Sequence, residues 1–527
     1  MVTLDKRKIN KSRILESIGI LGFIFLLWNS YGSRLFSKPT EQGSERTKIE
    51  FNLQHIYHNV PTVNSTRIDI NDEKLISLFS ENGVDTHHTI SARRQQVVRL
   101  RDRSPDTMES MILHSLNYPR INIDDSLMWG IDNIIAPNIT DPETILQLAK
   151  LASNAYARLP TDPSWRDVED PGDNFGTGFN ISYSIGWFDR GIRGHVFVES
   201  VGKEEKRAPL VIIAIKGTTA AGLGGGNGDP DNDGGRTGDD GKTIDQDKSN
   251  DNLLFSCCCG RVSSLWSTVC DCYEKTYTCN QNCLEKELRS PDKYYKAALD
   301  IYRNVTKLYP DSEIWVVGHS LGGALSSMVG RTFGLPVVTF EAPGEMLASK
   351  RLHLPMAPGV PEEMEHIWHF GNNADPIFMG VCNGPSSSCS LGGYAMESVC
   401  HSGMKCTYDA VHDLGWHVNI LNHRLKNVID NLLSQSNETA PCVRQSRCID
   451  CYDWTFVDHQ DKSSVSQTTS STSSSSSTST STSSATSTTT TRKRRCLKYT
   501  WYGSCYKWDD DDDDGWLKYA LPTPTNF

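Results

Sequence analysis

The middle of the chain contains several short apolar runs of the kind that forms strands buried on both faces of a sheet. These runs lie at residues 210–215, 314–317 and 335–340, and residues 365–370 are also predicted to form a strand. A further stretch, residues 187–200, alternates between apolar and polar positions around Gly191 and Gly194, which predicts a hairpin. The central part of the chain is therefore expected to contain a sheet.

Between these strands, apolar residues recur three and four positions apart, which is the spacing of one face of a helix. This spacing predicts helices at residues 141–158 and 293–309, and a terminal helix whose apolar face starts at Leu425. Helices and buried strands alternate from about residue 140 to about residue 430. The alternation predicts an α/β fold with a partly parallel sheet that is covered on both faces.

Residues 312–330 combine a predicted strand, the sequence Gly-His-Ser-Leu-Gly and a predicted helix. This order is that of a nucleophile elbow, in which a serine lies on a sharp turn and small residues let the neighbouring backbones pass closely. Gly318 and Gly322 flank Ser320, and the start of the helix offers free N–H groups to an oxyanion. We therefore predict that Ser320 is a catalytic nucleophile. The alternative is a glycine-rich turn without catalysis.

A nucleophilic serine needs a base, and the base needs an acid that orients it. In the chain order of α/β-hydrolases, both residues follow the serine. Asp375 is the favoured acid because it lies in the loop after the predicted strand 365–370, and catalytic residues gather at such strand ends. Asp409 and Asp413 are the alternatives, and their ordinary role would be that of solvated loop charges.

The base is expected at His423, which lies at the start of the terminal helix, just after the last core strand. The alternatives are His401, His412 and His417, each of which otherwise has a surface or structural role. The oxyanion hole is expected to use the backbone N–H of Leu321 and, from Thr218 at the end of strand 210–215, an N–H or a hydroxyl.

The N-terminal region has five basic residues before an apolar segment. The unbroken apolar core at 18–28 is short for a membrane span, but residues 14–36 supply enough length for a tilted helix. No small-x-small cleavage site follows, and Trp28 and Tyr31 are typical of a membrane interface. We therefore expect a signal-anchor at 14–36, with the N-terminus in the cytosol and the bulk of the chain in a lumen. A cleaved signal peptide is the alternative.

The composition supports a lumenal location. The formal net charge of −11 gives no support to nucleic-acid binding. The 16 cysteines have irregular spacings, and no histidine pair completes a zinc-finger pattern, so disulfides are favoured over zinc. Acceptors for N-glycosylation, which matter only in a secretory lumen, lie at Asn64, Asn138, Asn180, Asn304 and Asn437.

Two inserted segments have alternative interpretations. Residues 221–252 are rich in Gly and Asp and mimic the front of a calcium loop, but Asp240 stands where such a loop needs glutamate, so a flexible insertion is favoured. Residues 253–283 form a Cys-rich excursion with an apolar set that includes Leu253, Leu265 and Trp266. This excursion is either a lid that contacts lipid or a disulfide-held packing element.

These patterns divide the chain into seven parts. They are a cytosolic N-terminus at 1–13, the signal-anchor at 14–36, a polar stem at 37–110, the hydrolase domain at 111–435, a Cys-bearing spacer at 436–462, a disordered Ser/Thr-rich linker at 463–491, and a Cys-, aromatic- and Asp-containing tail at 492–527.

The catalytic motifs resemble those of the class 3 lipases, the family of the fungal triacylglycerol lipases. The resemblance lies in Gly-His-Ser-Leu-Gly-Gly-Ala-Leu at 318–325 and Ile-Lys-Gly-Thr at 215–218, and it implies an α/β-hydrolase fold over about 140–430. The family's acid motif, D-x-V-P, is matched loosely at Asp375, and its closing histidine matches His423 best. The chain departs from the family at Lys216, where an arginine is usual, and at 342–344, where Ala-Pro-Gly replaces a Pro-Arg turn.

Outside the catalytic motifs, the anchor, the sequence at 250–259 and the Val-Cys-Asp-Cys-Tyr run at 269–273 resemble the autophagy-related vacuolar lipases of fungi. This resemblance implies a type II membrane protein that travels through endosomal multivesicular bodies to the vacuole. It also implies hydrolysis of phospholipid or triacylglycerol that lyses autophagic bodies, with lipids and membranes as partners and no cofactor or metal. The alternatives are a serine esterase for soluble acyl esters, with the anchor used only for sorting, and an inactive lipid-binding glycoprotein.

Overall fold

The structure is a computed structural model. It describes residues 47–60, 64–70, 77, 79, 86–104, 107–108, 110–111, 128–157, 160, 165, 191–202, 205–219, 243–261, 266–357, 359–384, 386–445, 448–458, 496–499 and 505–508. The predicted signal-anchor, the calcium-loop-like stretch at 229–240, Asn180 and the Ser/Thr-rich linker lie outside these residues. Within the described ranges, we find no helix with the length and apolar character needed to cross a membrane.

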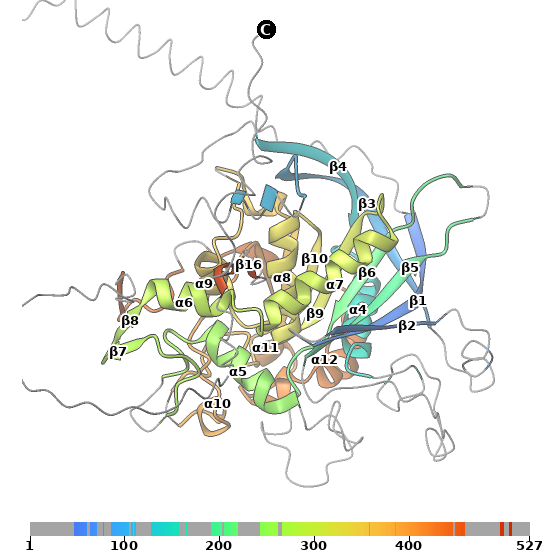
Figure 1. Ribbon diagram of the computed structural model, residues 1–527. Helices are drawn as coiled ribbons and strands as arrows, with labels where there is room; N and C mark the ends of the chain where they lie inside the picture. Colours follow the sequence, from blue (N-terminus) through green and yellow to red (C-terminus); the bar gives the residue numbers. More distant parts are fainter. Residues whose placement is uncertain are drawn as a thin grey trace, which may run out of the picture. The chain divides into compact units, whose positions relative to one another are not determined.

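A large mixed sheet organises the described part of the chain (Figure 1). In order across the sheet, its strands are β13 (Cys442–Arg444), β12 (Met404–Tyr408), β11 (Ile367–Asn372), β10 (Val337–Phe340), β9 (Ile314–His319), β6 (Val211–Ile215), β5 (Ile192–Glu199), β1 (Thr47–Val60), β3 (His87–Leu100) and β4 (Trp129–Pro137), and β2 (Asn64–Asp69) pairs with β1. The consecutive neighbours from β12 to β6 are parallel, and the pairs on both sides of them are antiparallel.

Helices cover both faces of the parallel part, because alternate residues of its strands point to opposite sides. On β9, Ile314 and Val316 belong to one hydrophobic cluster, to which α7 (Tyr294–Leu308) and α8 (Leu321–Phe333) also contribute. Trp315 and Val317 belong to a second cluster with α4 (Pro142–Asn154) and α12 (Leu425–Asn431). Figure 1 shows these helices beside the strands of the sheet. The predicted α/β fold is therefore confirmed.

The predicted stem is wrong from residue 47 onwards, because this segment supplies strands β1, β2 and β3 of the large sheet. On β1, Ile49, Phe51 and Leu53 are buried, whereas the residues between them are exposed or half-buried. A strand with one buried face contains as many polar as apolar residues, so its composition resembles that of a linker. The folded unit thus begins near residue 47 and not at 111.

The predicted hairpin at 187–200 is also wrong in its described part. Residues 192–199 form the single strand β5, which pairs antiparallel with β1 on one side and β6 on the other. Gly194 lies inside this strand, opposite Ile215. Gly191, at φ +103°, precedes the strand, and a Cβ there would lie 2.3 Å from the carbonyl oxygen of Asn59. The glycines therefore allow close packing and do not form a turn between two strands.

The Cys-rich excursion packs into the core. It runs from the end of α5 (Ile244–Phe255) through β7 (Tyr273–Lys275) and β8 (Thr278–Asn280) into the start of α6 (Gln281–Leu288). Leu253, Leu254 and Phe255 are only 2%, 3% and 0% exposed, so these residues of the predicted lid are not available to a lipid surface. Val262 and Leu265 lie outside the described residues, and Trp266 is half-buried.

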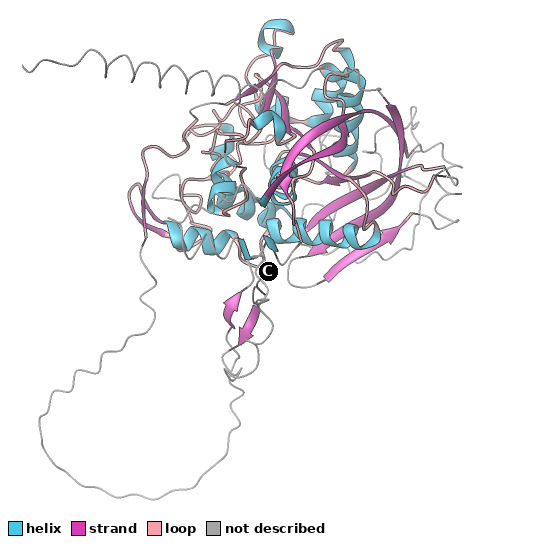
Figure 2. Ribbon diagram, turned by 90° about the horizontal axis from the view of Figure 1, so that it is seen from above, coloured by secondary structure: helices cyan, strands magenta, loops and turns pink. Residues whose placement is uncertain are grey.

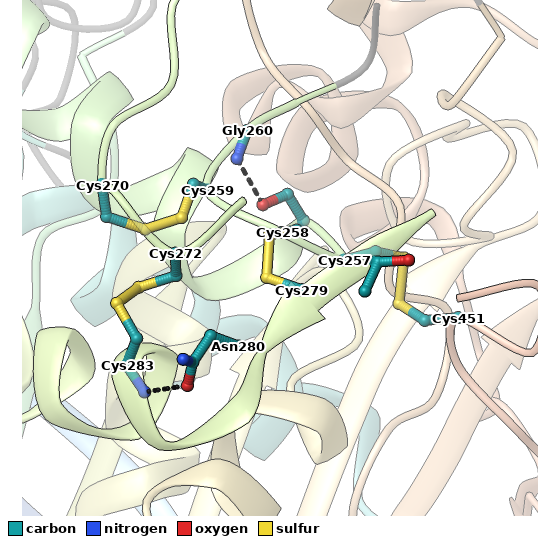
Figure 3. Close-up of a disulfide and its surroundings, with 12 residues drawn as sticks. Cys257, Cys258, Cys259, Gly260, Cys270, Cys272, Cys279, Asn280, Cys283 and Cys451 are labelled. Atoms are coloured by element: carbon teal, nitrogen blue, oxygen red, sulfur yellow. Dashed lines mark hydrogen bonds between the residues drawn. A yellow bond between two sulfur atoms is a disulfide. The ribbon is translucent and has the colours of Figure 1, made fainter. Parts of the chain in front are cut away.

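Within the described ranges, seven disulfides confirm the prediction of oxidised cysteines for fourteen of the 16. They are Cys257–Cys451, Cys258–Cys279, Cys259–Cys270, Cys272–Cys283, Cys382–Cys389, Cys400–Cys448 and Cys406–Cys442. Figure 3 shows the four that start in the excursion. Three of the seven connect residues 442–451 to the hydrolase core, so the predicted spacer is part of the folded unit.

Shorter elements complete the described chain. They are α9 (Met346–Arg351), η3 (Glu362–Met364), α10 (Ser388–Leu391), α11 (Ala410–Asp413), η4 (Ile420–His423), η5 (Leu433–Gln435) and β14 (Thr455–Val457), which pairs parallel with β8. In the tail, β15 (Cys496–Tyr499) and β16 (Cys505–Trp508) form a separate antiparallel pair (Figure 2).

Candidate active site

The topology brings the predicted site residues to one edge of the sheet. Thr218 follows β6, Ser320 follows β9, Asp375 follows β11, and His423 comes after β12 and α11. Since β6, β9, β11 and β12 belong to the parallel part, their carboxyl ends meet at the same edge. Residues that are far apart in the sequence can therefore meet there.

Ser320 lies on a strained turn between β9 and α8. Its backbone has φ 55° and ψ −129°, a conformation that side-chain-bearing residues rarely adopt. A Cβ at Gly318 would lie 2.4 Å from the Gly322 carbonyl oxygen, and a Cβ at Gly322 would lie 2.2 Å from the carbonyl oxygen of Ile215. Both glycines are thus required by backbone contacts, as the nucleophile-elbow pattern predicted.

The structure joins Ser320, His423 and Asp375 in one hydrogen-bonded series. The Ser320 hydroxyl oxygen is 2.8 Å from Nε2 of His423, and Nδ1 of His423 is 2.7 Å from Oδ2 of Asp375. Ser320 and His423 are each 8% exposed, and Asp375 is fully buried. With Asp375 ionised, Nδ1 carries the hydrogen, and Nε2 is left to accept the serine proton.

The environment of Asp375 favours the ionised form that this arrangement requires. Burial alone would raise the pKa of Asp375, but the charge and hydrogen bond of His423, together with other hydrogen bonds, bring that pKa below its usual value. One of these bonds comes from the backbone N–H of Ile377, which is 2.8 Å from Oδ1. Asp375 can therefore orient His423 and stabilise a positive charge on its ring.

The backbone of His423 is held by His319, the residue before the nucleophile. Nε2 of His319 donates to the His423 carbonyl oxygen at 2.8 Å, so Nδ1 accepts from the Tyr156 hydroxyl, also at 2.8 Å. Burial lowers the pKa of His319 to about 3, which keeps the ring neutral. Sequence reasoning did not assign this role, although the position of a histidine inside the serine motif was a usable signal.

The rejected candidates do not reach the serine. Asp409 caps α11, where its side chain accepts from the His412 N–H, and Asp413 is exposed beside the His412 ring. His417 is exposed. His401 is buried, but its Nε2 donates to the Ala342 carbonyl oxygen at 2.9 Å. Each of these residues has the ordinary role that the sequence analysis gave as its alternative.

The two predicted oxyanion donors flank the elbow. Leu321 is the first residue of α8, so its N–H has no acceptor within the helix. A Cβ at Gly217 would lie 2.4 Å from the carbonyl oxygen of His319, which shows that the loop carrying Thr218 lies directly against the elbow. The Thr218 hydroxyl donates to Oδ2 of Asp251 at 2.7 Å, so Asp251 fixes its rotamer.

Asp247 and Asp251, two buried acids on α5, accept hydrogen bonds from the loop that carries Thr218. Burial raises the pKa of Asp251 to about 8. Lys216, which replaces the arginine usual in class 3 lipases, is buried with Nζ 3.7 Å from Asp247. Asp247 also accepts the backbone N–H of Thr219 at 2.9 Å. Asp247 thus connects Lys216 and Thr219, which lie on either side of Thr218. Asp247 and Asp251 are four residues apart on one face of α5, a signal that sequence reasoning did not use.

The four described glycosylation acceptors differ in accessibility. Asn437 is exposed, Asn304 is half-buried on α7, and Asn64 is the first residue of β2. Asn138 is only 1% exposed, and its Nδ2, the atom that would carry a glycan, is buried. Asn138 is therefore a poor acceptor in the folded chain.

Two groups of potential metal ligands occur in the described ranges. They are Cys259, Cys270 and Cys272, and Cys400, Cys448 and Asp450. All five cysteines are in disulfides, so none can supply the thiolate that binds metal. We assign no metal site to these groups.

Comparison with known proteins agrees with this geometry. The profile of the family "Lipase (class 3)" matches residues 261–334. A Pichia angusta protein described as "Putative lipase ATG15" is 52% identical over 90% of this chain and 84% of its own length. The protein of the same description from Meyerozyma guilliermondii is 45% identical over 90% of each chain.

Solved lipase structures were also found. The lipase from Rhizopus microsporus var. chinensis is 13% identical and covers 50% of this chain and 74% of its own, with a TM-score of 0.22, too low to carry an argument. The sequence relatives show which family the chain belongs to, because their identity extends over most of both chains. The chain is a carboxylic ester hydrolase that belongs to the class 3 lipases, in the group formed by the yeast ATG15 proteins.

Proposed function

We propose that this lipase works with Ser320 as nucleophile, His423 as general base and Asp375 as the acid that orients the base. The observation that carries the proposal is the buried series in which Ser320 Oγ lies 2.8 Å from Nε2 of His423 and Nδ1 lies 2.7 Å from Asp375. All three groups are already in the arrangement that proton transfer needs.

In the proposed reaction, Ser320 Oγ attacks the acyl carbonyl carbon while its proton moves to Nε2 of His423. The backbone N–H groups of Leu321 and Thr218 stabilise the resulting oxyanion. The His423 ring then gives the proton to the leaving alkoxide, which frees the alcohol and leaves an acyl-serine. A water molecule, deprotonated by His423, hydrolyses this ester and releases the fatty acid.

We propose triacylglycerol or phospholipid as the substrate, met at a lipid surface. The support is residues 411–421, here named the rim segment, which leads from α11 to His423. Its apolar side chains Val411, Leu414, Val418 and Leu421 are 40–59% exposed. The segment is held against the Asp375 loop by hydrogen bonds from Val411 N–H to Asn373 Oδ1 at 2.9 Å and from Asn419 N–H to the Ala374 carbonyl oxygen at 3.0 Å.

Exposed apolar side chains on a fixed segment lose contact with water when they enter a lipid surface. The rim segment contacts the loop of Asp375 and ends two residues before His423. A lipid surface that binds it would therefore lie close to the reacting groups. This surface replaces the Cys-rich excursion as the proposed lipid contact.

We propose that the enzyme is a type II membrane protein with its catalytic unit in a lumen, delivered through multivesicular bodies to the vacuole, where it lyses autophagic bodies and other vesicles. Seven disulfides support an oxidising compartment. The basic residues before the apolar segment 14–36 support the orientation. The ATG15 description of the relatives supports a role in autophagy.

The test compares Ser320→Ala with the wild type on phospholipid vesicles, triacylglycerol emulsions and a soluble short-chain ester. Loss of a triad member should lower the rate by about a thousandfold or more on every substrate. Ser434→Ala, at an exposed serine, is the control and should keep full activity. Residual hydrolysis by Ser320→Ala close to the wild-type rate would reject the assignment. Wild-type activity on soluble esters alone would favour the soluble esterase.

A further inference from the structure

Glu341, directly after β10, is an unusual residue at this edge of the sheet. Its side chain is fully buried. Its backbone has φ 48°, in the left-handed region that favours glycine. Burial of a carboxyl group and a positive φ each lower the stability of the fold. A residue with both features is kept where the surrounding structure requires it.

The partners of Glu341 belong to the loops that carry the acid and the base. Asn372 donates to it twice, from Nδ2 to Oε1 at 2.8 Å and from its backbone N–H to Oε2 at 3.2 Å. The same Nδ2 also donates to the carbonyl oxygen of Asn422, the residue before His423, at 3.0 Å. Glu341 and Asn372 thus connect the end of β10 to both loops.

The carboxyl group of Glu341 also shares a hydrogen bond with that of Asp375. Two buried carboxyl groups can share a hydrogen bond only if one of them carries a proton. Asp375 faces the His423 ring, which favours its ionised form, whereas the hydrogen bonds that Glu341 accepts within the described ranges come from the neutral amides of Asn372. The proton therefore belongs on Glu341.

The electrostatics agree with this assignment. Burial, and then the charge and hydrogen bond of Asp375, raise the pKa of Glu341 well above its usual value. The other titratable groups that interact with the pair are His423, His319, Lys405 of β12 and Tyr408. Burial lowers the pKa of Lys405 to about 8, and its Nζ donates to the Phe378 carbonyl oxygen at 3.1 Å.

We propose that Glu341 is a positioning residue that stays protonated during turnover and donates its O–H to Asp375. This inference rests on the proposed role of Asp375. The bond fixes the orientation of the Asp375 carboxylate and stabilises its charge. It lets the His423–Asp375 pair lose its proton, and so become active, at a lower pH than it could alone.

The experiment records kcat/KM on a soluble short-chain ester against pH for Glu341→Gln and Glu341→Gly. Glutamine keeps a donor for Asp375 and an acceptor for Asn372, so its activity should stay within about threefold of wild type, with an unchanged acid limb. Glycine suits φ 48° and should fold, but it removes the donor. Its acid limb should move up by about one to two pH units, and its maximal kcat/KM should fall about tenfold or more.

The matched control is Glu345→Gln. Glu345 is also fully buried, and its carboxylate accepts the Ser327 hydroxyl at 2.8 Å and lies near His369. Its replacement should lower the thermal midpoint without moving the acid limb.

Three results would overturn the inference. They are a wild-type acid limb in Glu341→Gly, the same loss in Glu341→Gln as in Glu341→Gly, and a downward shift of the limb in Glu341→Gln, which would indicate a charged Glu341. Failure of the proposed triad is a separate result, because it would appear as activity close to wild type in Ser320→Ala or Asp375→Ala.

Discussion

At the scale of the residue, the site depends on buried acids whose protonation state is determined by the neighbouring residues. Asp375 is kept ionised by His423 and its hydrogen bonds. Burial, together with the charge of Asp247, raises the pKa of Asp251 to about 8, although its hydrogen bond from Thr218 opposes this shift. Two carboxyl groups near the same edge of the sheet therefore have opposite protonation states, because their partners differ.

This difference predicts a pH-dependent effect of Asp251→Asn on stability. The unfolded Asp251 loses its proton near pH 4, whereas the folded one keeps it up to about pH 8. Asp251 therefore stabilises the fold less and less as the pH rises from 4 to 8, by up to about 1.4 kcal/mol per unit. The variant lacks this loss, so its free energy of unfolding relative to wild type should increase across that range.

Urea unfolding at several pH values between 4 and 8 measures this effect. Asp409→Asn, at an exposed cap residue, is the control, and its difference from wild type should change much less over the range. Parallel curves for Asp251→Asn and wild type would show that Asp251 is ionised in the folded chain across the whole range.

At the scale of the element, disulfides and hydrogen bonds hold segments that have little core of their own. The excursion from α5 to α6 contains three internal disulfides, and a fourth, Cys257–Cys451, connects it to the C-terminal end of the folded unit (Figure 3). The rim segment is held in another way, by hydrogen bonds to the loop of Asp375. These two segments therefore call for different tests.

Removal of Cys257–Cys451 should destabilise the fold more than removal of Cys382–Cys389. The first disulfide joins residues 194 positions apart and the second joins residues 7 apart, so the first restricts the unfolded chain more. Chain entropy predicts losses of roughly 5 and about 2.5 kcal/mol for the two double Cys→Ser variants. Thermal unfolding without reductant measures both. Equal losses would mean that local packing, and not loop length, decides their contribution.

The rim segment should determine activity on lipid surfaces. We expect Leu414→Ser with Val418→Ser to lower hydrolysis of phospholipid vesicles about tenfold or more, because each exposed apolar side chain that enters lipid contributes up to roughly 1.5–3 kcal/mol. Hydrolysis of a soluble ester should change less than threefold. Ile131→Ser, at a 61% exposed residue of β4, is the control and should behave as wild type on both substrates. Equal losses on both substrates would place the segment in the fold or catalysis and not in lipid contact.

At the scale of the whole molecule, one sheet joins segments from both ends of the folded unit. The strands β1 to β4 extend it on one side, and β13 forms its edge on the other side. The catalytic edge lies in the parallel strands between them. Three disulfides then connect residues 442–451 back to the core. The lumenal location proposed for this unit agrees with its oxidised cysteines.

The lumenal location predicts glycans at the accessible acceptors. Asn437 is exposed and Asn304 is half-buried, so we expect both to be modified, whereas Asn138 should remain free because its Nδ2 is buried. Treatment with a glycosidase should increase the gel mobility of the wild type. Asn437→Gln and Asn304→Gln should each remove one step of that shift, and Asn138→Gln should remove none. An unmodified chain by mass spectrometry would count against the lumen.

The sequence by itself determined the parts of the fold that depend on short-range patterns. The apolar run at 314–317, the two glycines around Ser320 and the helical spacing after it were enough to predict β9, the elbow and α8. The strand, the turn and the helix follow one another directly in the sequence, so their combined pattern is visible locally, although the contact that requires glycine at 322 comes from Ile215 at the end of β6. The chain order of hydrolases then indicated Asp375 and His423, and the structure places both beside Ser320.

Only the tertiary structure decided which distant residues meet. Strand β1 looked like a polar stem, because a strand with one buried face is half polar and its partners are remote. The disulfide pairs, the burial of Leu253 to Phe255 and the carboxyl pair of Glu341 and Asp375 likewise depend on contacts between separate segments. Such contacts leave no periodic signal in the sequence, since the long-range packing of the whole sheet creates them.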